Sequence, residues 1–195
     1  MRQGTTRGPL ADRGNDFYET PPEATRALLR GLDPCMDFPR KVWEPAAGRG
    51  AISRELEAAG YEVVKTDLVA HEGADPGITS GVDFLMENRA PDGVRAIVTN
   101  PPYKNADEFI RHGLALRLRV FAFLRLAFLE GAARSDLIDT HLAQVYVGIE
   151  RLPKMNRDGW TGPRLGQETQ QFAWFVFDHH ERSGPIEMER ISWRA

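Results

Sequence analysis

The sequence has 195 residues, of which 42% are hydrophobic, so we expect one domain with an ample core. Its formal net charge of -3 excludes a global positive field, and binding to nucleic acid would need a local basic patch. The single cysteine, Cys35, excludes an internal disulfide bond and a cysteine-based zinc cluster. The longest apolar run, near residues 120–124, is too short to span a membrane and nothing resembles a signal peptide, so we expect a cytoplasmic protein.

The N-terminal part combines a predicted arm with a segment that has two interpretations. Residues 1–15 are rich in Gly, Arg and Thr and predict a flexible arm. The aromatic-Thr-Pro segment, residues 17–22, leads into a predicted helix over residues 24–32, which Thr20 or the prolines can open. The aromatic residues either anchor the arm to the core, or the whole segment lies over a cofactor.

A strand, a small-residue turn and a helix follow. Residues 41–43 predict the strand, residues 51–59 predict the helix, and the turn between them contains Gly48 and Gly50. Such a unit begins a nucleotide-binding α/β sheet, because the glycines let a ligand approach the backbone beside the helix N-terminus. The spacing is not the dinucleotide Gly-x-Gly-x-x-Gly pattern, and Glu44 would repel a pyrophosphate. A ligand with an amino-acid cation and no phosphate fits better, and S-adenosylmethionine is such a ligand.

Acidic residues accompany the next two predicted strands. The second strand, residues 61–66, ends at Asp67, where a carboxylate could accept both hydroxyls of a ribose. A helix cap or turn cap is the other interpretation of Asp67. After a polar loop over residues 69–79, residues 81–85 predict a short third strand, whose Asp83 could meet an adenine amine.

The most specific pattern follows a short apolar strand, residues 96–98. Asn100-Pro101-Pro102-Tyr103 can continue neither strand nor helix, and its prolines hold the backbone carbonyls rigidly in a turn. The side-chain oxygen of Asn100 and the carbonyl of Pro101 could accept both hydrogens of an exocyclic amine, while the ring of Tyr103 stacks on a planar base. Taken alone, the tetrapeptide could also be only a proline-rich turn.

The alternation of helices and strands in the second half predicts the fold class. A helix capped by Asn105 extends to residue 116. It is followed by a strand over residues 120–126, a largely helical segment over 127–141, and strands over 144–149 and 172–177. This order predicts an α/β fold with a doubly wound, mostly parallel sheet.

A long basic segment, residues 151–171, separates the last two predicted strands. It is irregular in pattern and contains Lys154, Arg157, Trp160 and Arg164. Cationic side chains beside a tryptophan suit backbone phosphates and a displaced base, so these four residues are predicted to bind the substrate. A merely mobile loop is the other interpretation.

The predicted catalytic domain, residues 16–180, ends just after the last strand, and residues 181–195 form a predicted tail. The trio Asp178-His179-His180 near this boundary could be taken for metal ligands. Because it has no fourth partner at a suitable spacing, we interpret it as a strand-end turn and expect no metal.

Together, the motifs resemble those of class I S-adenosylmethionine-dependent methyltransferases, and more narrowly the amino-methylating DNA enzymes of the N6-adenine type. The resemblance covers residues 16–177, with residues 17–21 matching the N-terminal cofactor motif, 44–50 the glycine motif and 100–103 the catalytic tetrapeptide. The implied catalytic residues are Asn100, Pro101, Pro102 and Tyr103. The implied cofactor-binding residues are Tyr18, Thr20, Pro21, Glu44, Pro45, Ala46, Gly48, Gly50, Asp67, Leu68, Asp83, Phe84 and Asn100.

The resemblance also implies a fold, a mechanism and partners. The fold is a Rossmann-like sheet of seven strands, mostly parallel with the last strand antiparallel. Fixed acceptors would localise the lone pair of the amine and aim it at the sulfonium methyl, without a metal. The base would be flipped out of a duplex and stacked on Tyr103. The expected partner is DNA, read without a separate recognition domain or with the help of a second copy or a recognition subunit.

Two alternatives stay open. A similar tetrapeptide occurs in enzymes that methylate RNA adenine or a protein glutamine amide, although those usually carry an extra substrate domain. A catalytically idle binding module with the cofactor fold is the second alternative. The presence of both the 100–103 tetrapeptide and the 44–50 turn argues against it, since an idle copy has no need of both.

Overall fold

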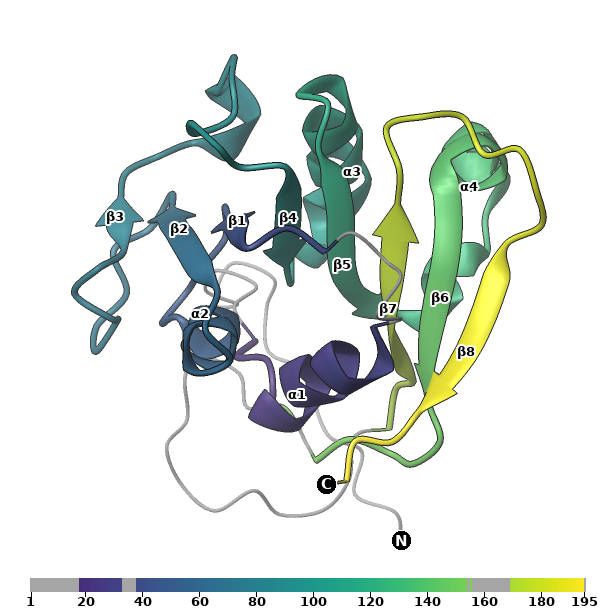
Figure 1. Cartoon of the computed structure of the whole chain (residues 1–195), viewed down its shortest axis with the longest axis horizontal. Coiled ribbons are helices and arrows are strands. Elements are labelled where there is room, and N and C mark those ends of the chain that lie inside the picture. Colours follow the sequence, from purple (N-terminus) through teal and green to yellow (C-terminus); the bar gives the residue numbers. More distant parts are fainter. Residues whose placement is uncertain (1–17, 33–37, 154, 156–168, 195) are drawn as a thin grey trace, which may run out of the picture.

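The computed structural model describes residues 18–32, 38–153, 155 and 169–194 (Figure 1). Within these residues the chain forms one eight-stranded sheet. Its strands are β1 (Lys41–Glu44), β2 (Glu62–Asp67), β3 (Thr79–Ser80), β4 (Ala96–Thr99), β5 (Arg119–Arg125), β6 (Leu142–Gly148), β7 (Phe172–Phe177) and β8 (Glu187–Ile191). The α-helices are α1 (Pro22–Gly31), α2 (Ala51–Ala58), α3 (Ala106–Ala115) and α4 (Ser135–His141). None of these helices is long and apolar enough to cross a membrane.

The strands lie in the order β3-β2-β1-β4-β5-β7-β6-β8. All neighbouring pairs are parallel except those of β7, which is antiparallel to both β5 and β6. This confirms the predicted doubly wound, mostly parallel sheet, with the seventh strand inserted antiparallel. Because β1, β2, β4 and β5 run in one direction, their carboxyl ends meet at a single edge of the sheet.

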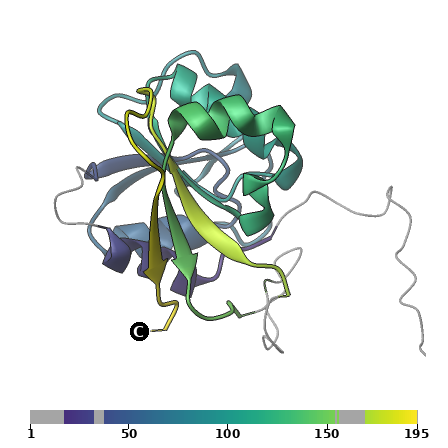
Figure 2. The same cartoon turned by 90° about the vertical axis from the view of Figure 1, so that its right-hand side faces the viewer.

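Apolar side chains alternate along the central strands and fill a core on each face of the sheet. On β5, Val120, Ala122 and Leu124 belong to the cluster that includes α3 and α4, whereas Phe121 and Phe123 belong to the cluster that includes α1 and α2. Figure 2 shows α1 (purple) and α4 (green) on opposite sides of the sheet. Helices on both faces explain why the central strands are continuously apolar.

Proline and glycine determine where the first two helices begin. Pro22 is the first residue of α1, a position where its missing N–H costs nothing. Gly50 precedes α2 with a φ of 83°, a left-handed conformation that favours glycine. The predicted cap of α3 is only partly right. Asn105 does precede α3, but its side chain makes no capping bond and donates to Glu108 instead.

One predicted element is wrong and another is only partly right. The sequence predicts a strand over residues 81–85, whereas the structure has β3 just before it and a 3-10 helix, η2 (Phe84–Met86), which Asp83 caps by accepting from the Leu85 N–H. The segment over 127–141, predicted as largely helical, is helical but interrupted. It is divided into η4 (Leu126–Leu129), η5 (Ala132–Arg134) and α4, with an extended Glu130 and with Gly131 at a φ of 107° between η4 and η5.

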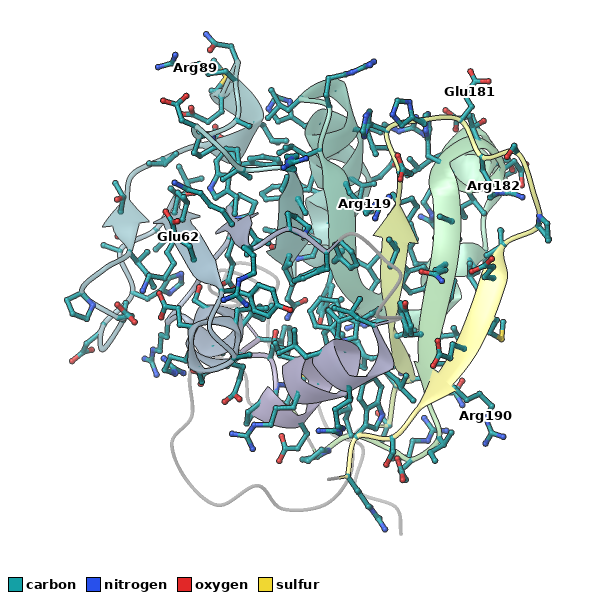
Figure 3. The ribbon with its side chains drawn as sticks, viewed as in Figure 1. Glu62, Arg89, Arg119, Glu181, Arg182 and Arg190 are labelled. Carbon is teal, nitrogen blue, oxygen red and sulfur yellow. The ribbon has the colours of Figure 1, made fainter. Side chains whose placement is uncertain are left out.

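The structure contains a strand that the sequence pattern does not predict. β8 lies within the predicted tail and pairs in parallel with β6 at one end of the sheet. Glu187, Met188, Glu189 and Arg190 are exposed, and Figure 3 shows Arg190 pointing away from the molecule. Charged side chains on an edge strand discourage pairing with another chain. Only Ile191 is buried, so β8 lacks the apolar run typical of a strand.

Candidate cofactor and substrate site

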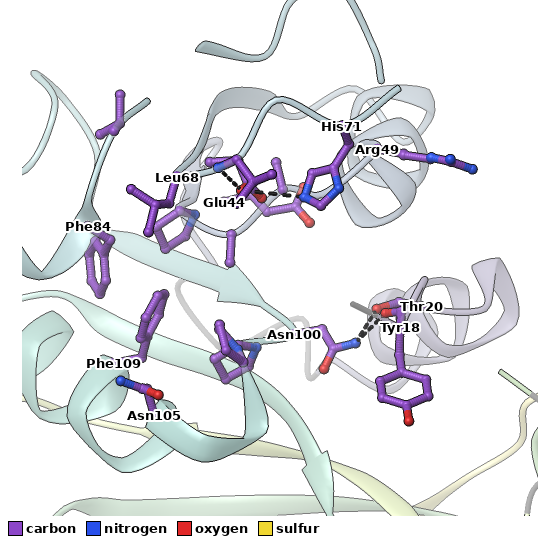
Figure 4. A pocket seen from close by; sticks show the side chains of 18 of the residues that line it. Tyr18, Thr20, Glu44, Arg49, Leu68, His71, Phe84, Asn100, Asn105 and Phe109 are labelled. Carbon is purple, nitrogen blue, oxygen red and sulfur yellow. Dashed lines mark hydrogen bonds and ion pairs between the residues drawn. The ribbon is translucent and has the colours of Figure 1, made fainter. Parts of the chain in front are cut away.

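A cavity of about 340 Å³ lies at the carboxyl edge of the sheet, among the loops that follow β1, β2 and β4 (Figure 4). Open α/β sheets bind their ligands at this edge. The predicted site residues that line the cavity are Tyr18, Thr20, Glu44, Pro45, Ala46, Asp67, Leu68, Asp83, Phe84, Asn100, Pro101, Pro102 and Tyr103. Pro21, Gly48 and Gly50 are not among the lining residues. Pro21 directly precedes α1, and Gly50 directly precedes α2. The backbone N–H of Gly48 donates to the carboxylate of Asp67, which does line the cavity.

The amide of Asn100 is held in one orientation by residues that are 80 positions or more away in sequence. Its Nδ2 donates to the backbone carbonyl of Tyr18 at 3.1 Å and to Oγ1 of Thr20 at 3.0 Å (Figure 4). Because a backbone carbonyl can only accept, the nitrogen must face Tyr18 and the oxygen must face away. Asn100 Oδ1 is buried and has no hydrogen-bond partner among the described residues. A buried acceptor without a donor is costly, and a ligand N–H would relieve that cost.

Tyr103 follows Asn100 by three positions, and its ring lies near Tyr18, Phe172 and Arg125. The ring of Tyr18 is 5.7 Å away between centroids, and that of Phe172 is 6.3 Å away. The guanidinium carbon of Arg125, the last residue of β5, lies 4.7 Å from the Tyr103 centroid. The predicted stacking of a base on Tyr103 therefore has to share the ring with a cation that the sequence analysis does not anticipate.

Glu44 is a buried carboxyl group at the end of β1, 2% exposed. Its Oε2 accepts from the backbone N–H of Ser53 at 2.9 Å and also from the Ser53 hydroxyl. Burial raises the pKa of Glu44 to about 8, although both bonds from Ser53 act in the opposite direction. The group therefore carries a proton at neutral pH when no cation lies near it.

Asp67 connects the end of β2 to the glycine turn. Its Oδ2 accepts from the Gly48 N–H at 2.7 Å, and its Oδ1 accepts from the Val69 N–H at 2.8 Å. His71 Nε2 lies 3.6 Å from Oδ1. A carboxylate has about four acceptor positions, and the two N–H donors leave capacity for hydroxyl groups of a ligand. Both interpretations of Asp67, turn cap and ligand acceptor, are thus compatible with its geometry.

Asp83 and Phe84 close the cavity on the side of η2. Asp83 is exposed and uses Oδ1 to accept from the Leu85 N–H at 3.1 Å. Phe84 is buried, with its ring 5.1 Å from that of Trp43 and 4.9 Å from that of Phe109. Phe84 therefore forms an apolar wall next to an exposed carboxylate.

Sequence reasoning misses the lining residues His71 and Phe109, and it gives no role to Glu19 and Arg49, which lie within the two matched cofactor motifs. The only signal for His71 is its place in the polar loop after the second predicted strand, because loops at this edge of a sheet carry ligand contacts. Glu19 forms an ion pair with Arg54 at 3.3 Å, which brings the N-terminal segment onto α2. Nothing in the local sequence indicates that contact.

Two further predictions concern residues later in the sequence. Lys154, Arg157, Trp160 and Arg164, the predicted substrate-binding residues, are outside the described residues. The polar atoms of Asp178, His179 and His180 lie within 4.8 Å of one another just after β7, at the opposite edge of the sheet from the cavity. Asp178 Oδ2 accepts from Arg119 at 2.8 Å, so this carboxylate already has a cationic partner.

The sequence matches no protein-family profile and no curated protein. Among solved structures, a proposed RNA methyltransferase from Pyrococcus horikoshii aligns with a TM-score of 0.58 at 16% identity, over 88% of this chain and 91% of that chain. A predicted O-methyltransferase from Agrobacterium tumefaciens aligns with a TM-score of 0.51 at 11% identity, over 87% and 84%. The modification subunit of a proposed type I restriction enzyme from Vibrio vulnificus aligns with a TM-score of 0.51 at 15% identity, over 92% of this chain and 48% of that chain. The chain therefore has a methyltransferase-type Rossmann-like fold.

Proposed function

We propose that this protein is an S-adenosylmethionine-dependent methyltransferase that methylates the exocyclic N6 amine of adenine in DNA. The observation that carries the proposal is the orientation of the Asn100 amide. Its nitrogen is occupied by Tyr18 and Thr20, and its buried oxygen is left as an acceptor at the cavity. A fixed, unsatisfied acceptor of this kind is what an N–H donor on the substrate requires.

The chain's own residues explain how an aromatic amine could become a nucleophile. Asn100 Oδ1 accepts one amine hydrogen and the Pro101 carbonyl accepts the other, which localises the nitrogen lone pair and fixes its direction. A bound methyl donor would supply the methyl group for the new N–C bond as its own C–S bond breaks, and the amine would then release one proton to solvent. Neither acceptor has to reorganise during the step, because the amide is held by two hydrogen bonds and the carbonyl by two prolines.

The polar groups of the cavity fit S-adenosylmethionine. Four carboxyl groups line it, from Glu19, Glu44, Asp67 and Asp83. In this proposal Glu44 binds the ammonium group, Asp67 accepts the ribose hydroxyls, and Asp83 accepts the adenine amine beside the apolar wall of Phe84. When bound, this cofactor supplies an electrophilic methyl group. A cavity rich in carboxylates does not suit a pyrophosphate, in agreement with the absence of the dinucleotide glycine pattern.

Two lines support adenine in DNA as the substrate. The Asn-Pro-Pro-Tyr form of residues 100–103 resembles that of N6-adenine enzymes. A modification subunit of a proposed restriction enzyme is among the structurally similar proteins. RNA adenine is the second candidate, because the proposed RNA methyltransferase from Pyrococcus horikoshii matches over nearly the whole of both chains.

The test is methyl transfer from labelled S-adenosylmethionine to DNA, RNA and protein in parallel, followed by digestion and identification of the methylated residue. We expect N6-methyladenine in DNA. Asn100→Ala should lower turnover by about 10²–10³-fold, as for other fixed hydrogen-bond groups, while leaving cofactor affinity nearly unchanged. Asn88→Ala is the matched control, because Asn88 is exposed and does not line the cavity. Near wild-type turnover of Asn100→Ala at saturating DNA would refute the mechanism. If the labelled methyl group is found only in RNA or protein, that molecule replaces DNA as the proposed substrate.

A further inference from the structure

Arg125 places a positive charge beside the catalytic tetrapeptide. It is the last residue of β5, and β5 pairs with β7 so that Arg125 stands opposite Phe172. Both residues contact the ring of Tyr103, with the guanidinium carbon of Arg125 at 4.7 Å from the ring centroid. The cation is therefore next to the group on which the target base is proposed to stack.

The charge of Arg125 is not neutralised within the described residues. Arg54, Arg111 and Arg119 each form an ion pair with a carboxylate, at distances of 3.3, 2.7 and 2.8 Å. Arg125 is exposed, and its described contact is with an aromatic ring. A cation–π contact holds a guanidinium in place without cancelling its charge, so the group can still bind an anion.

The position of Arg125 indicates what kind of anion it meets. Arg125 does not line the cofactor cavity, whereas Tyr103 does. The cation thus lies next to the tyrosine but outside the lining that contains the carboxyl groups. A flipped nucleotide enters with a phosphodiester on each side of its sugar, and arginine is suited to phosphate because its planar fork can donate two parallel hydrogen bonds. Lys104, next in sequence to Tyr103, is also exposed and adds positive charge at this edge.

We infer that Arg125 is a positioning residue that binds a backbone phosphate flanking the target adenine, an assignment that rests on the proposed function. Arg125 binds the phosphate and also contacts Tyr103. It therefore couples the position of the DNA backbone to the orientation of the ring on which the base stacks. The contact carries no sequence information, since every nucleotide has the same phosphate.

The test compares Arg125→Ala with wild type on two duplexes that share one target adenine. One duplex has ordinary phosphates, and the other has neutral methylphosphonates on both sides of the target. On the ordinary duplex we expect Arg125→Ala to raise KM about tenfold or more and to reduce the salt dependence of binding by about one phosphate, a slope change of about 0.9. On the neutral duplex wild type and variant should have equal KM. Arg190→Ala is the matched control, because Arg190 is exposed on the edge strand β8.

Each other outcome has a defined meaning. Arg125→Lys keeps the positive charge, so it should keep the salt dependence of DNA binding and recover part of the DNA affinity. If Arg125→Ala does not bind the cofactor, Arg125→Lys is compared with wild type instead. A loss that is equally large on the neutral duplex would overturn the inference and leave Arg125 as a packing neighbour of Tyr103. Unchanged KM and salt slope would overturn it as well. If wild type methylates no adenine in DNA, the proposed function fails instead, and duplex binding by fluorescence anisotropy still tests the phosphate contact.

Discussion

Replacing Glu44 by glutamine should change how the stability of the protein depends on pH. The carboxyl group is 2% exposed, and burial raises its pKa from 4.5 to about 8. Between these two pKa values the folded state keeps a proton that the unfolded state has lost. The stabilising contribution is therefore complete below about pH 4.5 and is lost as pH rises to about 8, by about 1.4 kcal/mol per pH unit. Over the whole interval the loss is about 5 kcal/mol.

Glutamine isolates this effect because it cannot titrate and its carbonyl oxygen can accept both bonds from Ser53. Urea unfolding followed by tryptophan fluorescence, at several pH values from 5 to 9, measures the free energy of unfolding of both proteins. Trp43 and Trp174 are buried and report on the core. We expect similar stability near pH 5 and a Glu44→Gln variant that is more stable near pH 9 by several kcal/mol. The exposed Glu181→Gln should follow wild type. If the free energy of unfolding depends on pH in the same way for wild type and Glu44→Gln, the pKa of Glu44 is not raised, because water in the cavity solvates the carboxylate.

Three other substitutions test the site and its support. Thr20→Val should lower kcat about tenfold with little effect on cofactor affinity, because the amide of Asn100 loses one of its two anchors; steady-state kinetics with saturating cofactor measures this. Asp67→Ala should weaken cofactor binding about ten- to a hundredfold, measured by calorimetric titration, because charge-assisted bonds to the ribose are lost. Gly148→Ala should destabilise the protein by about 1–3 kcal/mol in urea unfolding, since a Cβ would come within 2.0 Å of the buried indole of Trp193.

Two of these variants have matched controls. Thr20→Ser keeps the hydroxyl and should retain most of the activity; equal loss in both variants would contradict the anchoring role. If cofactor affinity is unchanged in Asp67→Ala, the ribose contact has to be assigned to Glu44 or Asp83 instead. For Gly148, the control is Gly184→Ala, because an added Cβ at Gly184 has no atom within 4 Å. Equal stabilities of the two alanine variants would mean that Trp193 adjusts without cost.

The cavity residues that could be predicted from the sequence share one property. Each is indicated by a pattern in the residues next to it. Asp67 ends an apolar strand, and Asn100 begins a turn that two prolines make unmistakable. Both therefore reach the carboxyl edge of the sheet by chain order alone. The contacts of Asn100 with Tyr18 and Thr20 and that of Arg125 with Tyr103 join distant segments and leave no local pattern. Such contacts arise from tertiary packing, which strand and helix periodicity does not encode.

The strands and helices likewise divide into those predictable from local sequence and those that depend on tertiary packing. β5 and β7 are continuous apolar runs and were predictable from composition, because both of their faces are buried. β8 is a strand only because β6 offers it an edge, and its exposed charged residues have low strand propensity. The interruption before α4 was not predictable from apolar periodicity, because it lies at Glu130, which is extended, and at Gly131, whose φ is 107°.

The insertion of β7 between β5 and β6 has a consequence for the order of assembly during synthesis. As the chain emerges from the ribosome, β1 to β5 can pair with one another, but β6 must wait for β7, and β8 can pair only with β6. The described residues that line the large cavity run from Tyr18 to Phe109 and are made before this delay. Phe172, which packs against Tyr103, is made after it. A nascent chain can thus assemble the cavity first and complete the packing of Tyr103 last, when β7 pairs between β5 and β6.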